Sequence, residues 1–441
     1  MTIIGRRGGV LLASVAMILA ACSSGGGSAS PAASTGASTE ASAAASPAAS
    51  GAASASASAC VGPATITFLA PPWAVVDEAS LKAWTNKTGI TVQTISVPNE
   101  QVYQKVGLSL ASQQSPADVI FTSEEGPSFI VSAGALEPLD AYIARDQAAV
   151  NPTDIARLDF WNRDGKQYGL TAYLQSILLD YNAKKFAAGG LTAMPKTWDE
   201  FLADAEKLKS SGADPKPIAF AGTSWAWYLM SLSMGDKLFD DQLQPTFNAA
   251  GSPARKAMAM FVKMYQDGLI SPDQLTARDP HAVFGGGVGT LHQSWLGADA
   301  VWNNPATSKQ APDVKYMTIP EGNTTWAFDA AIGIGKYSKN KDCAWEFLKY
   351  YLDTANQNHL FNTFGLFPAR TSVIKTLTDA GKIVQPEVQL SPKIVYLPRF
   401  EKYWGQWDSF VTETVRQALQ GQITSDQAID AIAAKWAELK G

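Results

Sequence analysis

The chain has 441 residues, more than one hydrophobic core normally serves, so its length predicts two packed lobes. Its 35 Lys and Arg against 40 Asp and Glu give a net charge of −5, and no run of basic residues could follow a phosphate backbone. This balance excludes nucleic acid as a partner. The three histidines lack the spacing of metal ligands and have no nearby cysteine, so neither a metal site nor a cofactor is expected.

The first 21 residues have the features of a bacterial export signal. Arg6 and Arg7 supply its charge, a short apolar stretch follows, and small residues precede Cys22. The apolar stretch is too short for a membrane-spanning helix. The quartet LAAC at residues 19–22 resembles the lipobox of bacterial lipoproteins, in which the cysteine is acylated and becomes the new N-terminus. The alternative is an unlipidated signal peptide with a chance cysteine.

Residues 22–59 are expected to form a flexible tether. They are almost entirely Ala, Ser, Gly, Pro and Thr, with Glu40 as their one charge, and such a composition cannot bury enough apolar surface to fold. A Gaussian chain of this length reaches on the order of 30 Å. With Cys22 acylated, Cys60 and Cys343 remain as a candidate disulfide in an oxidising compartment. A free Cys60 with Cys343 buried on a helix is the open alternative.

Strand and helix patterns alternate through the rest of the chain. Residues 64–70 (ATITFLA) alternate β-branched and apolar residues and stop at two prolines, as a strand does when it ends in a loop. The expected strands are 64–70, 90–97, 117–121, 177–181 and 218–221, and the expected helices are 77–87, 102–112, 198–210, 254–267, 343–352 and 410–419. This alternation predicts an α/β fold with parallel sheets, whose ligands gather beyond the carboxyl ends of the strands.

Several blocks, in this order along the chain, carry a resemblance to a known family. The most specific is DGKQYGLTAYLQSILLDYNAKKFAAGGL (164–191) followed by PKTWDEF (195–201). The other blocks are ADVIF (117–121), AGALEPLD (133–140), FVKMYQDGLISPD (261–273), VFGGGVGTLHQSW (283–295), AIGIGKYSKNKDCAWEFLKYY (331–351), GLFPAR (365–370) and VRQALQGQITSDQAID (415–430). Together they resemble the family 1 extracellular solute-binding proteins, the sugar-binding components of ATP-driven importers that include the maltose-binding type. One departure is the glycine run at 285–287, where the family often carries a lysine.

The resemblance implies a two-lobed α/β fold of the periplasmic-binding-protein type, class II, with hinge crossovers and a ligand cleft between the lobes. The implied first lobe comprises residues 64–171 and 329–370, the second 172–327 and 371–441, and the crossovers lie near 171–175 and 326–330. It further implies a monomer, anchored by lipid to the outside of the cell membrane, that delivers a small ligand to the permease subunits of an ABC importer.

A sugar site needs planar aromatic side chains for the ring faces, and carboxylates or amides for the hydroxyls. The chain supplies 13 Trp and 13 Tyr. The candidates, at loop positions beyond strands or at the crossovers, are Trp73, Glu124, Glu125, Tyr173, Gln175, Trp225, Trp227, Trp295, Trp326, Asp329, Trp404 and Trp407. Trp404 and Trp407 are expected just ahead of a helix.

The sequence supports other functions less well. A surface glycosidase would act through paired carboxylates, but no nucleophile elbow or metal triad is present, and carboxylates serve sugar binding equally well. A structural or adhesive lipoprotein would not require the crossover blocks. Within the binding class, the acidic candidates leave a cationic solute open, such as a polyamine or an amino sugar. The sequence does not determine which ligand is bound.

Overall fold

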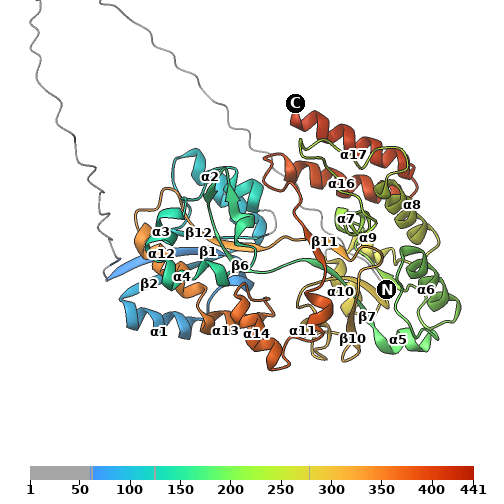
Figure 1. The fold of residues 1–441 in the computed structure, drawn as a ribbon, viewed down its shortest axis with the longest axis horizontal. Coiled ribbons are helices and arrows are strands. Elements are labelled where there is room, and N and C mark those ends of the chain that lie inside the picture. The colour runs from blue at the N-terminus through green and yellow to red at the C-terminus, as the bar shows by residue number, and fades with distance from the viewer. Residues whose placement is uncertain (1–59, 61–62, 124–125, 278) are drawn as a thin grey trace, which may run out of the picture. The chain divides into compact units, whose positions relative to one another are not determined.

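The structure is a computed structural model that describes residue 60 and residues 63–123, 126–277 and 279–441. The predicted signal peptide, the tether and Cys22 lie outside the described residues, as do Glu124 and Glu125. The two main sheets are a five-stranded sheet of order β2-β1-β3-β12-β6 and a four-stranded sheet of order β10-β7-β9-β8. Helices flank both sheets (Figure 1). We call the five-stranded sheet with its packed helices the first lobe, and the four-stranded sheet with its packed helices the second lobe.

The first lobe contains β1 (Ala64–Ala70), β2 (Ile90–Ser96), β3 (Val119–Thr122), β6 (Leu170–Tyr173) and β12 (Ala330–Ile334), with α1 (Glu78–Thr88), α2 (Asn99–Ala111), the π-helix η2 (Pro127–Val131), α3 (Asp140–Arg145), α4 (Gln147–Val150), the short β4 (Asn162–Arg163) and β5 (Lys166–Gln167), α12 (Lys341–Tyr351) and α13 (Thr354–Phe364). Strands β1, β2 and β3 are parallel, whereas β12 is antiparallel to both β3 and β6. The expected parallel sheet is therefore wrong for β12. The chain reaches β12 directly from β11 in the second lobe. A parallel neighbour would need a crossover connection, usually a helix, and no helix lies between β11 and β12.

The second lobe contains β7 (Ile177–Asn182), β8 (Ile218–Ala219), β9 (Leu291–Trp295) and β10 (Val314–Met317), with the pair β11 (Thr324–Trp326) and β13 (Lys393–Val395), and the helices α5 (Ala183–Ala188), α6 (Trp198–Ser210), α7 (Ser224–Ser233), α8 (Pro253–Gln266), α9 (Asp273–Thr276), α10 (Pro280–Gly285), α11 (Asp299–Trp302), α14 (Thr371–Asp379), α15 (Pro386–Gln389), α16 (Trp404–Leu419) and α17 (Ser425–Lys440). Strand β7 is antiparallel to β9 and β10, and β8 is parallel to β9. The expected parallel sheet is therefore also wrong for β7, which the chain enters directly from the first lobe.

Helix α16 begins six residues earlier than the sequence predicted, at Trp404 rather than Phe410. The reason is visible in its buried side chains, because Trp404, Trp407, Val411 and Val415 follow the spacing of one helical face. The two tryptophans thus belong to the helix and pack inward, and do not precede it on a loop.

The described chain passes between the lobes at three places, and the three segments lie side by side. The first joins β6 to β7, the second joins β11 to β12, and the third joins α13 to α14. The Leu174 N–H donates to the Phe367 carbonyl (2.9 Å), and the Phe328 N–H donates to the Gln175 carbonyl (3.1 Å). These backbone bonds tie the second and third crossings to the first.

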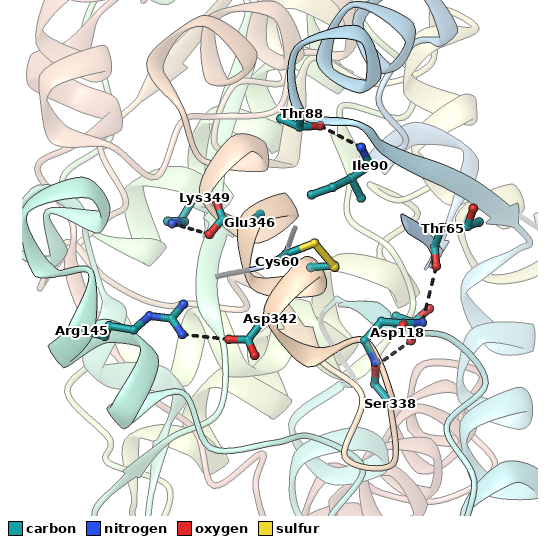
Figure 2. Close-up of a disulfide and its surroundings, with 12 residues drawn as sticks. Cys60, Thr65, Thr88, Ile90, Asp118, Arg145, Ser338, Asp342, Glu346 and Lys349 are labelled. Carbon is teal, nitrogen blue, oxygen red and sulfur yellow. Dashed lines mark hydrogen bonds and ion pairs between the residues drawn. A yellow bond between two sulfur atoms is a disulfide. The ribbon is translucent and has the colours of Figure 1, made fainter. Parts of the chain in front are cut away.

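Cys60 and Cys343 are joined by a disulfide, with an S–S distance of 1.97 Å and Cα atoms 4.8 Å apart. Figure 2 shows the bond beside the first turn of α12, where the Arg145 guanidinium also pairs with Asp342 at 2.8 Å. The bond connects the residue that precedes the first strand to the body of the first lobe. No helix in the part of the chain that the structure describes is both long and apolar enough to cross a bilayer.

Candidate ligand-binding site

The strand registers place the carboxyl ends of strands from both lobes at the crossings. In the second lobe, Trp295 at the end of β9 pairs with Ile177, the first residue of β7 after its crossing, and the parallel β8 ends on the same side. In the first lobe, Thr122 at the end of β3 pairs with Ala331, just after the second crossing. Side chains that follow β1, β3, β8 and β9 therefore gather where the chain passes between the lobes.

On the first lobe, a half-buried tryptophan stands beside the crossings. Trp73 follows β1 and contacts Phe121 and Tyr173 edge-to-face, with ring centroids 5.4 and 5.7 Å apart. Tyr173 itself is buried, at 5% exposure, so it supports Trp73 and offers little surface of its own. Trp73 keeps part of its ring accessible, as a stacking platform requires.

A polar group lies next to this platform. The Tyr103 hydroxyl is 2.7 Å from the Ser123 hydroxyl, which donates to the Asn99 side-chain oxygen at 3.0 Å. Ser123 ends the described part of the loop that follows β3, immediately ahead of Glu124 and Glu125. Tyr103 is half-buried and is a ligand-contact candidate that the sequence reading did not name, whereas Ser123 is 1% exposed and supports the Tyr103 hydroxyl.

On the second lobe, Trp225 supplies a matching half-buried ring. It lies in the first turn of α7, at the carboxyl end of β8, and packs against Trp326 (5.4 Å) and Phe328 (5.2 Å) of the second crossing. Trp326 is 1% exposed, and the Arg399 guanidinium lies over its ring at 5.3 Å. Trp326 is thus a support for Trp225 and not a ligand contact, contrary to expectation.

The carboxylate beside Trp225 is Asp408, which the sequence reading missed. One of its oxygens accepts hydrogen bonds from the Ser224 and Tyr228 hydroxyls, both at 2.7 Å, and its side chain is half-buried on α16. Burial, together with the nearby Asp408, raises the pKa of Tyr228 well above its ordinary value, so this phenol remains a donor. The signal in the sequence was an aspartate one residue after Trp407, on the helix face next to the buried one.

The Asp408 region of α16 meets the first lobe. Gly405 lies three residues before Asp408, on the same side of the helix. A Cβ at Gly405 would come within 2.8 Å of the Phe129 ring, and Phe129 in turn stacks on Tyr103 with centroids 5.5 Å apart. Ser132 of the first lobe also donates to the Phe400 carbonyl. Polar and aromatic groups of the two lobes are therefore neighbours here.

Asp329, on the second crossing, hydrogen-bonds to the first crossing and is not a ligand contact, contrary to expectation. It is fully buried, and its Oδ1 accepts from the Arg157 guanidinium (2.8 Å) and the Gln175 N–H (2.7 Å). Burial raises the pKa of Asp329 to about 6, against the opposing effects of Arg157 and the Gln175 N–H. The half-buried Gln175 accepts from the Ser176 N–H through its side-chain oxygen (3.2 Å) and stays a candidate at the first crossing.

Three further tryptophans predicted to contact ligand lie in the core of the second lobe. Trp227 and Trp407 are 0% exposed and Trp404 is 2% exposed. The Trp227 indole donates to the Ala254 carbonyl and that of Trp407 to the Ile432 carbonyl, both at 3.0 Å. Burial on all sides leaves these rings no face for a ligand, so we exclude them from the site.

Trp295 borders a hollow of about 660 Å³ in the second lobe, which we call the Trp295 cavity. Its wall also contains Trp302, His281, Asp279 and Lys309. Trp295 is half-buried, and the His281 ring stands edge-on to it with centroids 4.8 Å apart. A volume of this size lies within the range of small-molecule sites.

Residues 72–358 match the model of the bacterial extracellular solute-binding proteins. The chain belongs to this family. The solute-binding protein is 27% identical over 298 residues to the diacetylchitobiose binding protein DasA of Streptomyces coelicolor, a match that covers 63% of this chain and 65% of that protein. It is 28% identical over 313 residues to the probable amino-acid ABC transporter periplasmic-binding protein y4oP of Sinorhizobium fredii, covering 66% and 69%.

Solved structures confirm the fold of this solute-binding protein. The substrate-binding protein of Listeria monocytogenes in complex with cycloalternan aligns with a TM-score of 0.74 at 20% identity, covering 86% of this chain and 99% of that one. The predicted two-lobed α/β fold and the predicted family are both confirmed. The match to DasA spans just under two thirds of that protein's length.

Proposed function

We propose that this solute-binding protein captures a sugar or oligosaccharide between its lobes, outside the cytoplasm, and delivers it to the permease of an ABC importer. The observation that carries the proposal is the pair of half-buried rings, Trp73 and Trp225, one from each lobe, at the ends of the strands that meet the crossings. Pyranose faces stack on such rings, while the half-buried Tyr103 hydroxyl can donate or accept and the Asp408 carboxylate can accept hydrogen bonds at the sugar hydroxyls.

Closure follows from the division of these groups between the lobes. Each lobe alone offers part of a hydrogen-bonding shell, so a ligand gains contacts in the closed state that it lacks in the open one. Short crossings such as 174–176 and 327–329 are the kind of segment that absorbs the backbone change of a hinge. The closed form is then the form that the permease recognises.

The names of the relatives support a carbohydrate ligand but do not identify which one. DasA is named for diacetylchitobiose, and the Listeria structure contains cycloalternan. The name of y4oP points instead to amino acids. The carboxylate of Asp408 keeps a cationic solute, such as an amino sugar or a polyamine, as the second candidate.

A ligand panel tests the proposal. We would titrate full-length Cys22→Ala protein with N,N′-diacetylchitobiose, maltose, mannitol, amino acids, glucosamine and spermidine, using thermal shift and then calorimetry. A ligand at 100 times its Kd stabilises the folded state by about 2.7 kcal/mol, so a neutral sugar should raise the melting temperature. Trp225→Ala should weaken that binding, while Tyr337→Ala, a half-buried aromatic beyond the opposite end of β12, should not. A response to amino acids or spermidine alone would contradict the sugar assignment.

We further propose that acylated Cys22 anchors the protein to the membrane, as the LAAC quartet and the following uncharged tether indicate. Cys22→Ala should move the protein to the soluble fraction, whereas the control Cys60→Ser should remain on membranes. Membrane association of Cys22→Ala equal to that of the parent would contradict the anchor.

A further inference from the structure

A chain of hydrogen bonds runs from the core of the second lobe to the wall of the Trp295 cavity. Asp180 on β7 and His292 on β9 are directly paired in the sheet register and are 0% and 1% exposed. Asp180 Oδ1 lies 2.9 Å from His292 Nδ1, and His292 Nε2 lies 3.1 Å from His281 Nδ1. Phe284 stacks on the His292 ring with centroids 4.0 Å apart, which fixes the orientation of that ring.

The direction of these bonds decides what His281 presents to the cavity. A carboxylate only accepts, so His292 Nδ1 carries the proton that it donates to Asp180. If that is the one proton of His292, its Nε2 accepts from the His281 Nδ1–H, and His281 Nε2 carries a lone pair. Burial, and secondly the neighbouring His292, lower the pKa of His281 to about 3, which keeps this ring neutral.

The geometry points to the Trp295 cavity as a further binding surface for the proposed sugar ligand, with His281 as its specificity-determining residue. His281 Nε2 accepts a hydrogen bond from a hydroxyl or acetamido N–H of the sugar ring that stacks on Trp295. This inference rests on the proposed function. His281 and Trp295 both line the cavity, with their rings edge-to-face and their centroids 4.8 Å apart, so a sugar that stacks on Trp295 within the cavity has His281 as a neighbour. His281 was set aside in the sequence reading, because three scattered histidines showed no metal spacing.

Asp180 acts through the two imidazoles and is a positioning residue. In Asp180→Asn, the amide N–H can donate to His292 Nδ1, which transfers the His292 proton to Nε2. His281 Nδ1 must then accept, so that its Nε2 carries the proton and becomes a donor. A substitution buried beneath the cavity wall should therefore reverse the hydrogen-bond polarity of the site, while the shape of the site remains.

The first test is a ¹⁵N NMR spectrum of the histidines in ligand-free, full-length Cys22→Ala protein. The chain has only three histidines, so single substitutions assign the signals. His281 should show a protonated Nδ1 and an unprotonated Nε2 at neutral pH, and Asp180→Asn should exchange the two. A protonated Nε2 in the parent protein would overturn the inference, and this readout requires no ligand.

The second test is calorimetry with N,N′-diacetylchitobiose and with maltose. His281→Phe keeps a planar ring but removes the acceptor, so the affinity for the sugar that binds should fall about tenfold, as expected for one lost hydrogen bond. His359→Phe, a partly exposed histidine of α13 in the first lobe, is the matched control and should leave affinity unchanged. Equal affinity of the parent and His281→Phe would overturn the inference and leave the proposed function standing. Binding of neither sugar, nor of any other sugar in the panel, would overturn both.

Discussion

Replacing Trp407 and Trp225 in turn should separate stability from ligand binding. Trp407 is fully buried, lies nearly parallel to Tyr228 (13°, 6.1 Å) and 5.1 Å from Trp436, and donates to the Ile432 carbonyl. Truncating a buried Trp to Ala costs about 3–5 kcal/mol through the cavity that it leaves. The carbonyl left without its donor adds to this cost. We therefore expect Trp407→Ala to lose about 4 kcal/mol of unfolding free energy.

Trp225→Ala should instead lose ligand affinity and keep most of the stability of the parent, because Trp225 lies at the candidate site. Its ring is half-buried, so the stability cost should be well below that of Trp407→Ala, whereas loss of one stacking contact, worth about 1 kcal/mol, should weaken binding roughly fivefold. Urea unfolding followed by circular dichroism measures the first quantity, and calorimetry with the best ligand of the panel the second. Full stability with lost affinity in Trp407→Ala would refute the reasoning, because it would place that ring against the ligand.

Three further predictions concern the hinge, the contact between the lobes and the disulfide. Burial raises the pKa of Asp329 to about 6, above its ordinary 3.8, so the folded state keeps a proton that the unfolded state releases. The parent should therefore lose on the order of 3 kcal/mol of unfolding free energy relative to Asp329→Asn as the pH rises from about 4 to above 6. A difference in urea midpoint between the parent and Asp329→Asn that is the same at pH 4 and pH 7 would contradict this. Gly405→Ala should push against the Phe129 ring and weaken ligand affinity, while Gly107→Ala, with no atom within 4 Å of the added Cβ, should not; equal affinities in calorimetry would refute the contact. Unfolded, unreduced Cys22→Ala protein should show no reactive thiol, since its two remaining cysteines are bonded, and two thiols in fresh protein would refute the bond.

Local elements of the fold could be read from the sequence. The structure places β1 at Ala64–Ala70 and α6 at Trp198–Ser210, the ranges that the residue pattern predicted. Helix α6 begins at a capping box formed by Thr197 and Glu200, a signal contained in four consecutive residues. The direction of β12 could not be read in this way, because it depends on the chain returning from the other lobe.

The sequence predicted where the candidate site lies, at strand ends near the crossings, better than it predicted which residues form the site. The residue pattern placed Trp73 after a strand, where the structure also has it, and placed Trp225 at a loop position, whereas it lies in the first turn of α7; both are half-buried. Whether a tryptophan on α7 or α16 faces the core depends on which helices pack against it. Trp407 faces the core because α17 packs against α16, and the Ile432 carbonyl of α17 accepts a hydrogen bond from its indole. His281 required the register of two strands, since its orientation depends on a carboxylate 101 positions earlier in the chain.

Hydrogen–deuterium exchange with and without saturating ligand tests the central claim most directly, because it reports on both lobes in one experiment. Binding between the lobes should slow exchange at the same ligand concentration in residues 73–76 and 99–106 of the first lobe, and in residues 223–228 and 404–409 of the second. The crossings at 174–176 and 327–329 should change with them. Slowed exchange confined to one lobe at full occupancy would contradict a ligand held between the two lobes.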